Sequence, residues 1–445
     1  MSTPTPRTAA DETPAPNETA DVVVVGAGPA GATAAAYLAQ AGLDVALLEK
    51  ARFPRDKICG DGLTPRAVKE LISLGVPHEE SDGWIRNRGL RLIGGGHLVE
   101  IDWPDVQEYP NYGLAMPRTG FDEVLARYAV EHGARLSEGA SVTGPLHDSS
   151  GRVCGVQVKC LDERGRATGE RRTVRAPVVL ACDGVSARLA VAEGRERRTD
   201  RPMGVGVRTY YETPRSHDDY MESWMELWVD KDPEDPSAGR ILLPGYGWIF
   251  ALGDGTSNVG LGILDTSPAF GTLDYKDVLR RWVATLPPEW TFDEEHRSGA
   301  VRGAALPMAL GRVPHYADGL LLLGDAGGMI SPFNGEGIAH AMEAARLAAE
   351  LVVEAHGQDG ATRDRVLARY PSAVRAEMGG YFRLGSVFAH LIGHPEIMRL
   401  AVRHGLPRRT LMRFLVKIMA GLAEPTGGGL DDRVISTLAR MTPSA

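Results

Sequence analysis

Residues 21–31 read DVVVVGAGPAG, a run of four valines that leads directly into a Gly-x-Gly-x-x-Gly turn. Consecutive β-branched residues favour a buried strand, and the small residues from Pro29 to Gln40 favour a helix packed closely on it. In this arrangement Gly26 takes the turn at positive φ, Gly28 leaves room for a phosphate, and Gly31 lets the helix approach the strand. The stretch therefore predicts a dinucleotide pyrophosphate at the start of the helix.

A second apolar strand at residues 45–48 ends at Glu49, with Lys50 beside it. An acid at this point of a dinucleotide-binding unit hydrogen-bonds a ribose hydroxyl. A glycine turn alone also occurs in ordinary strand-to-helix connections, but here the strand, the helix and the acid agree. The pattern leaves both NAD and FAD open as the nucleotide.

Composition narrows the class of protein. The chain has 445 residues, enough for two or three domains, and a formal net charge of -9, which argues against nucleic acid as a partner. Its four cysteines form neither a metal pattern nor a disulfide framework, so we expect no metal and a reducing cytoplasm. No long apolar run occurs, so we expect a cytoplasmic protein, at most peripheral on the inner face of the cell membrane.

Changes in pattern along the chain predict four regions. Residues 1–19 are rich in Pro, Thr and Ala and read as a disordered leader rather than a signal peptide. Alternating strand and helix signals assign residues 20–84, 115–200 and 301–360 to a discontinuous nucleotide-binding domain. Strand-rich residues 85–114 and 201–300 are assigned to an inserted β-sheet domain, and residues 361–445 to a helical region.

A second strand-to-helix crossing far along the chain decides between the nucleotides. Residues 319–323 form an apolar strand that ends in Gly324-Asp325, and Gly335-Glu336-Gly337 then opens a long Ala-rich helix from residue 338 to residue 354. An extended FAD needs such a second contact: Asp325 can accept a ribityl hydroxyl, while the helix start offers N–H groups to the flavin pyrimidine. A turn or helix cap is the alternative for an isolated Gly-Asp pair.

Together these motifs resemble the flavoprotein hydroxylase (glutathione-reductase-like) fold, an α/β class with a Rossmann-type FAD-binding domain, an inserted antiparallel β-sheet substrate domain and, here, a C-terminal helical region. Its fingerprints are the glycine turn, an internal Asp-Gly pair and a late Gly-Asp pair. The FAD-binding residues that the resemblance implies are Gly26, Gly28, Ala30, Gly31, Glu49, Lys50, Arg118, Asp183, Gly184, Gly324, Asp325, Gly335 and Gly337. No second glycine turn follows a strand, so the electrons are expected from transiently docked NAD(P)H or from a small redox protein.

Within that fold the chain is similar to the geranylgeranyl reductase family, closest to the actinobacterial branch that saturates an isoprene unit of menaquinone. The similarity lies in the loop at residues 53–67, in residues 244–250 and in residues 331–337. The second segment, PGYGWIF, resembles a family motif that ends in proline, but Ala251 stands at that position here. The resemblance implies FAD as cofactor and a prenyl lipid, a menaquinone or geranylgeranyl chain, as substrate.

The implied chemistry points to four further residues. An isolated prenyl double bond is not polarised, so its reduction requires a hydride at one carbon and a proton at the other in a dry channel. Tyr246, Trp248 and Phe250 alternate along one strand and therefore face one side, where they could form the apolar wall of that channel or simply a sheet core. Cys59 lies in the loop expected at the flavin, where it could gate, donate a proton or contact the ring, or be inert.

A basic segment near the C-terminus suggests where substrate could enter. Its cations are Arg399, Arg403, Arg408, Arg409, Arg413 and Lys417, interspersed with apolar residues. Such a helix can rest on an anionic bilayer and admit a lipid tail, or it can pack on the protein with a solvated basic face.

The sequence thus favours a FAD-dependent prenyl reductase. The alternative is a flavin-dependent monooxygenase or halogenase of the same fold, acting on an apolar or aromatic substrate. A third, non-enzymatic hypothesis is a prenyl-lipid carrier that keeps FAD as a structural element.

Overall fold

The computed structural model describes residues 17–231, 235–267, 269–424 and 429–441. Its centre is a six-stranded sheet in the order β21-β22-β13-β2-β3-β9. The strands are β2 (Val22–Val25), β3 (Val45–Glu49), β9 (Arg135–Glu138), β13 (Val178–Ala181), β21 (Tyr316–Ala317) and β22 (Leu320–Leu322). All neighbours pair in parallel except β21 and β22. This sheet confirms the Rossmann-type core that the first glycine turn predicted.

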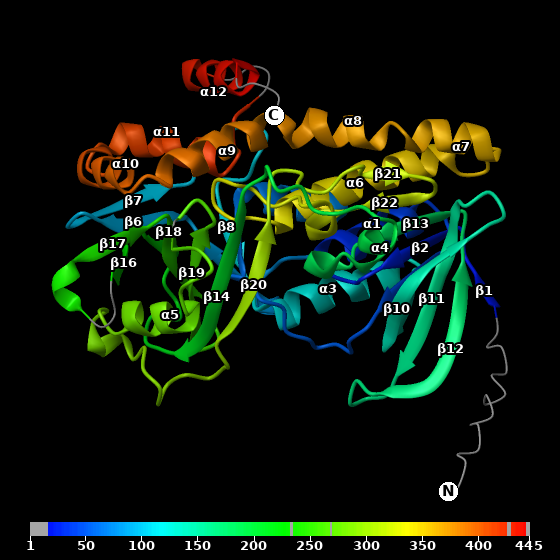
Figure 1. Cartoon of the computed structure of the whole chain (residues 1–445), viewed down its shortest axis with the longest axis horizontal. Coiled ribbons are helices and arrows are strands. Elements are labelled where there is room, and N and C mark those ends of the chain that lie inside the picture. The colour runs from blue at the N-terminus through cyan, green and yellow to red at the C-terminus, as the bar shows by residue number, and fades with distance from the viewer. Residues whose placement is uncertain (1–16, 232–234, 268, 425–428, 442–445) are drawn as a thin grey trace, which may run out of the picture.

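The valine run lacks polar alternation because both faces of the central sheet are covered. Val22 and Val24 pack with the helices α1 (Pro29–Gln40), α3 (Arg118–Glu131) and α6 (Ile338–Ala355). Val23 and Val25 pack against a second sheet on the opposite face. That sheet has the order β1-β12-β11-β10 and contains β1 (Asn17–Thr19), β10 (Ala140–His147), β11 (Val153–Leu161) and β12 (Ala167–Arg175), visible at the right of Figure 1.

Strand β1 corrects the predicted limit of the disordered leader. Residues 17–19 pair in parallel with β12, and Glu18 forms ion pairs with Arg135 and Arg172. The polar composition of the segment concealed this strand because a strand added at a sheet edge is held by backbone hydrogen bonds and needs no apolar face. The rest of the predicted leader, residues 1–16, lies outside the described residues.

The inserted sheet has seven strands in the order β20-β14-β19-β18-β15-β6-β7. Its members are β6 (Gly89–Gly94), β7 (His97–Asp102), β14 (Met203–Glu212), β15 (Tyr220–Trp224), β18 (Gly245–Ala251), β19 (Thr256–Leu264) and β20 (Arg302–Pro307). Helix α5 (Tyr275–Val283) packs on one face. The sheet is antiparallel as expected, except that β6 and β15, which come from separate excursions of the chain, pair in parallel.

Two stretches of the inserted part are divided into separate strands. Strands β17 (Arg240–Leu243) and β18 are distinct because Pro244 between them has no N–H to donate. Strands β15 and β16 (Leu227–Asp230) are also distinct, and β16 pairs with β17 in a separate hairpin. Strand β20 hydrogen-bonds to β14, whereas the predicted boundary at residue 301 assigned it to the FAD-binding part.

Short elements connect the two main sheets. Helix α2 (Pro65–Leu74) ends at Gly75, which has a φ of +88°, a conformation that favours glycine. Strands β4 (Gly62–Leu63), β5 (Ile85–Asn87) and β8 (Gly113–Ala115) form a small sheet of their own. Helix α4 (Arg188–Ala192) follows the Asp183-Gly184 pair.

The C-terminal region is helical, as expected, and lies across both sheets at the top of Figure 1. Its helices are α7 (Gly360–Leu367), α8 (Tyr370–Val374), α9 (Gly380–Ile392), α10 (Pro395–Leu400), α11 (Arg409–Met419) and α12 (Leu430–Met441). Among the described residues, none of the helices combines the length and the hydrophobicity needed to cross a bilayer.

Candidate flavin and substrate cavity

One cavity of about 590 Å³ joins the nucleotide-binding sheet to the inserted sheet. Every cofactor-binding residue predicted from the sequence lines it except Gly31, and so do Cys59, Tyr246, Trp248 and Phe250. The structure therefore brings together residues that are up to 311 positions apart, from Gly26 to Gly337.

The glycine turn has the geometry that the sequence predicted. Gly26 has a φ of +98°, in the region that favours glycine. A Cβ on Gly31 would lie 1.8 Å from the carbonyl oxygen of Gly26, so a larger residue would force the helix away from the strand. A Cβ on Gly28 would meet no backbone, and its nearest neighbours would be the side chains of Arg55, Asp122 and Arg118 at 3.7–4.0 Å.

Two arginines therefore approach the glycine turn, of which the sequence identified only Arg118. Arg118 is buried and forms a two-bond ion pair with Asp122, at 2.5 and 2.7 Å. Arg55 donates to Asp122 at 2.8 Å and to Glu49 at 3.3 Å. Two guanidinium groups beside an open glycine turn suit a diphosphate. Arg55 was missed because its loop gave no sign that it folds back over the turn.

Glu49 is held firmly at the end of β3. Its carboxylate accepts hydrogen bonds from the backbone N–H groups of Ala27 (3.0 Å) and Ala51 (2.9 Å), and it is only 4% exposed. This arrangement fixes the acid next to the glycine turn, where a nucleotide ribose would lie. Its contact with the ribose stays a prediction.

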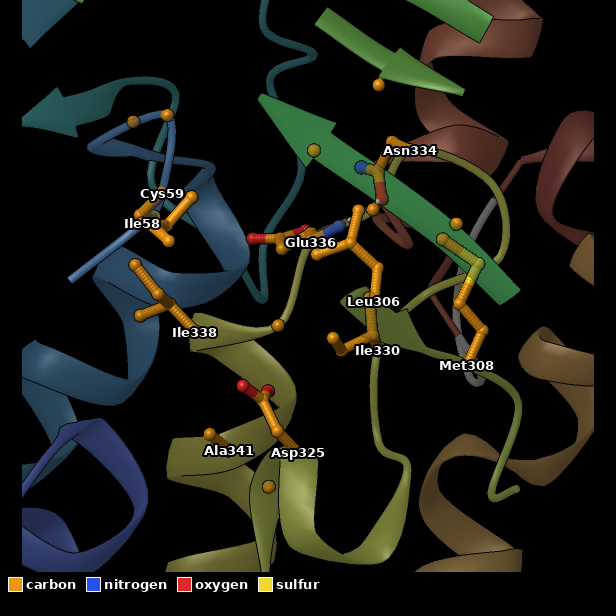
Figure 2. Close-up of a pocket in the computed structure, with 18 of the residues that line it drawn as sticks. Ile58, Cys59, Leu306, Met308, Asp325, Ile330, Asn334, Glu336, Ile338 and Ala341 are labelled. Atoms are coloured by element: carbon orange, nitrogen blue, oxygen red, sulfur yellow. Dashed lines mark hydrogen bonds between the residues drawn. The ribbon is translucent and has the colours of Figure 1, made fainter. Parts of the chain in front are cut away.

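Two aspartates lie further along the cavity. Asp183 accepts a hydrogen bond from the Leu189 N–H at 3.2 Å through one oxygen, while its other oxygen is buried without a partner among the described residues. Burial raises the pKa of Asp183. Asp325 lies 3.8 Å from the ammonium group of Lys57, and Figure 2 shows it beneath the loop that carries Glu336. The unpartnered oxygen of Asp183, at the polar end of the cavity, could accept a hydrogen bond from a cofactor hydroxyl.

The aromatic residues of β18 form one wall of the cavity. Tyr246, Trp248 and Phe250 follow one another along the strand, with ring centroids 6.1 and 6.3 Å apart, whereas Ile249 packs on the opposite face under α5. A Cβ on Gly260 of the neighbouring strand would lie 2.3 Å from the Trp248 ring, so the glycine is required there. The Tyr246 hydroxyl donates to the carbonyl of Asn334 at 2.6 Å, which leaves its ring against the cavity.

Asn258 connects this wall to the loop that carries Cys59. Its side-chain oxygen accepts a hydrogen bond from the Trp248 indole at 2.8 Å. Its NH₂ group donates to the Cys59 carbonyl at 2.8 Å and to the Asp61 carboxylate at 2.7 Å. Asn258 and Asp61 are both fully buried. Sequence reasoning missed both residues, because nothing in the neighbouring sequence distinguishes them from ordinary surface polar residues.

Cys59 itself is half-buried, and its thiol accepts a hydrogen bond from the Asp61 N–H at 3.4 Å. Burial raises the pKa of the thiol, which outweighs the opposing influence of nearby Arg118. The side chain is therefore a neutral thiol near pH 7. Its predicted roles stay predictions, as do those of the aromatic wall.

The far end of the cavity is apolar and is closed by the C-terminal helices. Its lining there includes Phe388, Ile392, Met398, Val402, Leu406, Met412, Val416 and Met419. The sequence predicted the amphipathic character of these helices but not the surface that their apolar side covers. Lys417, which the sequence counted with the basic face, is buried and pairs with Asp431 (2.9 Å) and Asp432 (2.7 Å) from α12.

A nucleotide-binding sheet and a glycine turn, open along one cavity to an aromatic and apolar chamber, define a FAD-dependent oxidoreductase. Residues 19–240 match the FAD binding domain family. Menaquinone reductase of Mycobacterium tuberculosis is 39% identical over 408 residues, which cover 91% of this chain and 92% of that protein. The chain belongs to the geranylgeranyl reductase family of FAD-dependent oxidoreductases, which confirms the resemblance noted from its motifs.

Two further relatives are more distant. Digeranylgeranylglycerophospholipid reductase 1 of Methanopyrus kandleri is 32% identical over 393 residues, covering 85% of this chain and 91% of that protein. A crystal structure of a geranylgeranyl bacteriochlorophyll reductase-like protein from Thermoplasma acidophilum superposes with a TM-score of 0.74 and 21% identity, covering 95% of this chain and 100% of the other. This last similarity bears on the fold alone.

Proposed function

We propose that the protein saturates a C=C bond in the isoprenoid side chain of menaquinone, with geranylgeranyl chains as the next candidate. The observation that carries this proposal is the continuity of the cavity from the glycine turn to an apolar chamber between β18 and the C-terminal helices. The identity of 39% to a menaquinone reductase across nearly the whole chain supports the choice of substrate.

The chain's own residues would hold the cofactor at one end and the prenyl chain at the other. Arg55 and Arg118, which flank Gly28, would bind the pyrophosphate, Asp325 the ribityl chain, and the N–H groups at the start of α6 the flavin ring. When bound and reduced, FAD supplies the hydride for the reaction. The aromatic wall would orient the alkene and exclude water, so that the reacting carbons stay close to the ring.

An anaerobic single-turnover experiment tests this function. The bound flavin is reduced with dithionite, menaquinone or geranylgeranyl diphosphate is added, and flavin absorbance and product mass are followed. We expect reoxidation of the flavin together with a gain of two hydrogens in the prenyl chain. Reduced flavin that no prenyl acceptor reoxidises would favour the carrier hypothesis. Oxygen uptake that depends on an apolar or aromatic substrate would favour the monooxygenase or halogenase alternative.

The electron donor is part of the same proposal. The chain has no second glycine turn of the nucleotide-binding kind, so we propose that NAD(P)H docks transiently or that a small redox protein delivers the electrons. Anaerobic flavin bleaching by NADH, by NADPH or by a reduced ferredoxin distinguishes these donors. No bleaching by either nicotinamide would leave the protein donor as the candidate.

We further propose that the C-terminal helices rest on an anionic bilayer. Leu391, Ile397, Leu400 and Leu411, on α9, α10 and α11, are 39–63% exposed. Two exposed cations, Arg403 after α10 and Arg413 on α11, belong to the same stretch of chain. The exposed apolar side chains suit the acyl region of a bilayer, and the cations suit its anionic headgroups. Flotation with liposomes that contain anionic phospholipid should carry the protein upward, whereas Leu400→Glu should reduce flotation. Equal behaviour with and without liposomes would refute the contact.

A further inference from the structure

Glu336 is a half-buried acid at the cavity that the predicted roles leave unused. It lies in the loop before α6 and lines the cavity, and Figure 2 shows its side chain turned toward the loop of Ile58 and Cys59. One of its oxygens accepts a hydrogen bond from the Thr64 hydroxyl at 2.6 Å. The other is buried and has no partner among the described residues. A carboxyl with one buried and unsatisfied oxygen calls for an explanation.

Thr64 shows that this carboxyl is held in place at the expense of local stability. Thr64 occupies the N-cap position of α2, where a threonine hydroxyl normally accepts a backbone hydrogen bond and stabilises the helix by about 1 kcal/mol. Here it makes no capping bond and donates to Glu336 instead. The segment that carries Cys59 therefore fixes the position of the Glu336 carboxyl.

Charged and titratable groups surround Glu336 from several elements. They are Arg66 on α2, Tyr246 on β18, Tyr381 on α9, and His340 and Glu343 on α6. Burial raises the pKa of Glu336, against the opposing effects of His340, the Thr64 hydrogen bond and Arg66.

Glu343, one helical turn away from His340, shows the opposite behaviour. Burial would raise its pKa, but its ion pair with Arg66 and its hydrogen bond with His340 lower the pKa to about 2. The pKa values of these two carboxyls, one in the loop before α6 and one on α6, are thus shifted in opposite directions. Such a separation is typical of sites where one carboxyl serves as an acid.

We propose that Glu336 is the acid that protonates the alkene during prenyl reduction. This inference rests on the proposed function. The C=C π bond breaks as one carbon gains a hydride from the reduced flavin and the other gains the Glu336 proton, so two C–H bonds form and the flavin is oxidised. Glu336 is left as a carboxylate and takes a new proton from water after the product leaves.

Two other side chains at the cavity are weaker candidates for this acid. Burial raises the pKa of the Cys59 thiol and that of the Tyr246 hydroxyl. The Tyr246 proton is also engaged in the hydrogen bond to Asn334. A weaker acid transfers its proton more slowly near neutral pH, so Glu336 is the better matched donor.

The variant Glu336→Gln tests the proposal, because glutamine keeps the shape and the acceptor for Thr64 but carries no acidic proton. In the anaerobic single-turnover assay we expect reoxidation of the flavin to slow by about 100-fold or more, with FAD still bound. The wild-type rate should fall as the pH rises through the pKa of Glu336, and this fall should be lost in the variant. A readout independent of turnover is the infrared band of a protonated carboxyl in the unreduced protein near neutral pH, which Glu336→Gln should remove.

Controls separate this proposal from the proposed function. Glu350→Gln on the exposed side of α6 should behave like wild type in every assay. If wild type itself reduces no prenyl chain, the proposed function fails; if Glu336→Gln turns over at the wild-type rate with the same pH profile, only the role of Glu336 fails. Should Glu336→Gln not fold, Thr64→Val serves instead. This change removes a hydrogen bond that lowers the pKa of Glu336, so the pH at which the reduction rate falls should be higher than in wild type. A pH–rate profile identical to that of wild type would overturn the proposal.

Discussion

Replacement of Asn258 by alanine should destabilise the protein far more than the loss of one buried amide normally does. The change leaves the buried Trp248 indole N–H without its acceptor and removes the hydrogen bonds to the Cys59 carbonyl and the Asp61 carboxylate. An unsatisfied buried donor costs about 1–3 kcal/mol, a neutral hydrogen bond contributes about 1 kcal/mol, and one to a charged group about 1.5–3 kcal/mol. We therefore expect Asn258→Ala to lower the free energy of unfolding by roughly 4 kcal/mol.

Asn87 provides a matched control within the same chain. It is also buried, and its side-chain oxygen accepts a hydrogen bond from the Trp103 indole at 2.8 Å, but its NH₂ group has no partner among the described residues. Asn87→Ala should therefore cost only about 2 kcal/mol. Urea denaturation followed by far-UV circular dichroism measures both variants.

The difference between the two variants should also depend on pH. Burial raises the pKa of Asp61 to about 6, although hydrogen bonds from Asn258 and Tyr210 act to lower it. Removal of the Asn258 donor raises this pKa further. A carboxyl whose pKa is raised in the folded state stabilises the protein at low pH, and this stability is lost as the pH rises. The loss of unfolding free energy in Asn258→Ala, relative to wild type, should therefore grow from about pH 5 to about pH 8. Equal losses for the two asparagine variants, or a deficit independent of pH, would refute the reasoning.

Three further predictions concern the same cavity. Cys59→Ala should impair alkene reduction while FAD stays bound, measured by single turnover against Cys154→Ala as control; wild-type turnover would remove Cys59 from the mechanism. Gly31→Ala should abolish FAD binding, because its Cβ would lie 1.8 Å from a backbone oxygen, whereas Gly144→Ala, with no atom within 4 Å of its Cβ, should keep the flavin absorbance of wild type. Wild type should lose unfolding free energy as the pH rises from about 4 to about 7, because the pKa of Asp61 is raised to about 6, and Asp61→Asn should lose less over this range. If urea denaturation gave the same dependence of unfolding free energy on pH for both proteins, the raised pKa of Asp61 would be contradicted.

The nucleotide-binding core was predicted well from the sequence because its geometry depends on contacts between residues that are close in the sequence. The positive φ of Gly26 and the close approach at Gly31 follow from residues within one turn of each other, so the motif determines the geometry. The common orientation of Tyr246, Trp248 and Phe250 likewise follows from the two-residue period of a strand.

The polar contacts around the cavity could not be predicted in this way. Asn258 contacts Cys59 and Asp61 across 199 and 197 positions of sequence, and no local pattern records such a pair. The position of Arg55 over the glycine turn likewise depends on how a long loop folds back. For the C-terminal helices, the apolar spacing indicated a buried side, but a hydrophobic period does not identify what covers it.

The order of strands has a consequence for synthesis of the protein in the cell. Strand β22 lies beside β13 in the interior of the central sheet, yet it comes from residues 320–322. A growing polypeptide that has left the ribosome only as far as residue 300 presents the open edge of β13, which is prone to pair with other nascent chains. Chaperone protection is therefore most needed during this interval, which ends only when residues 320–337 have completed both the sheet and the cavity.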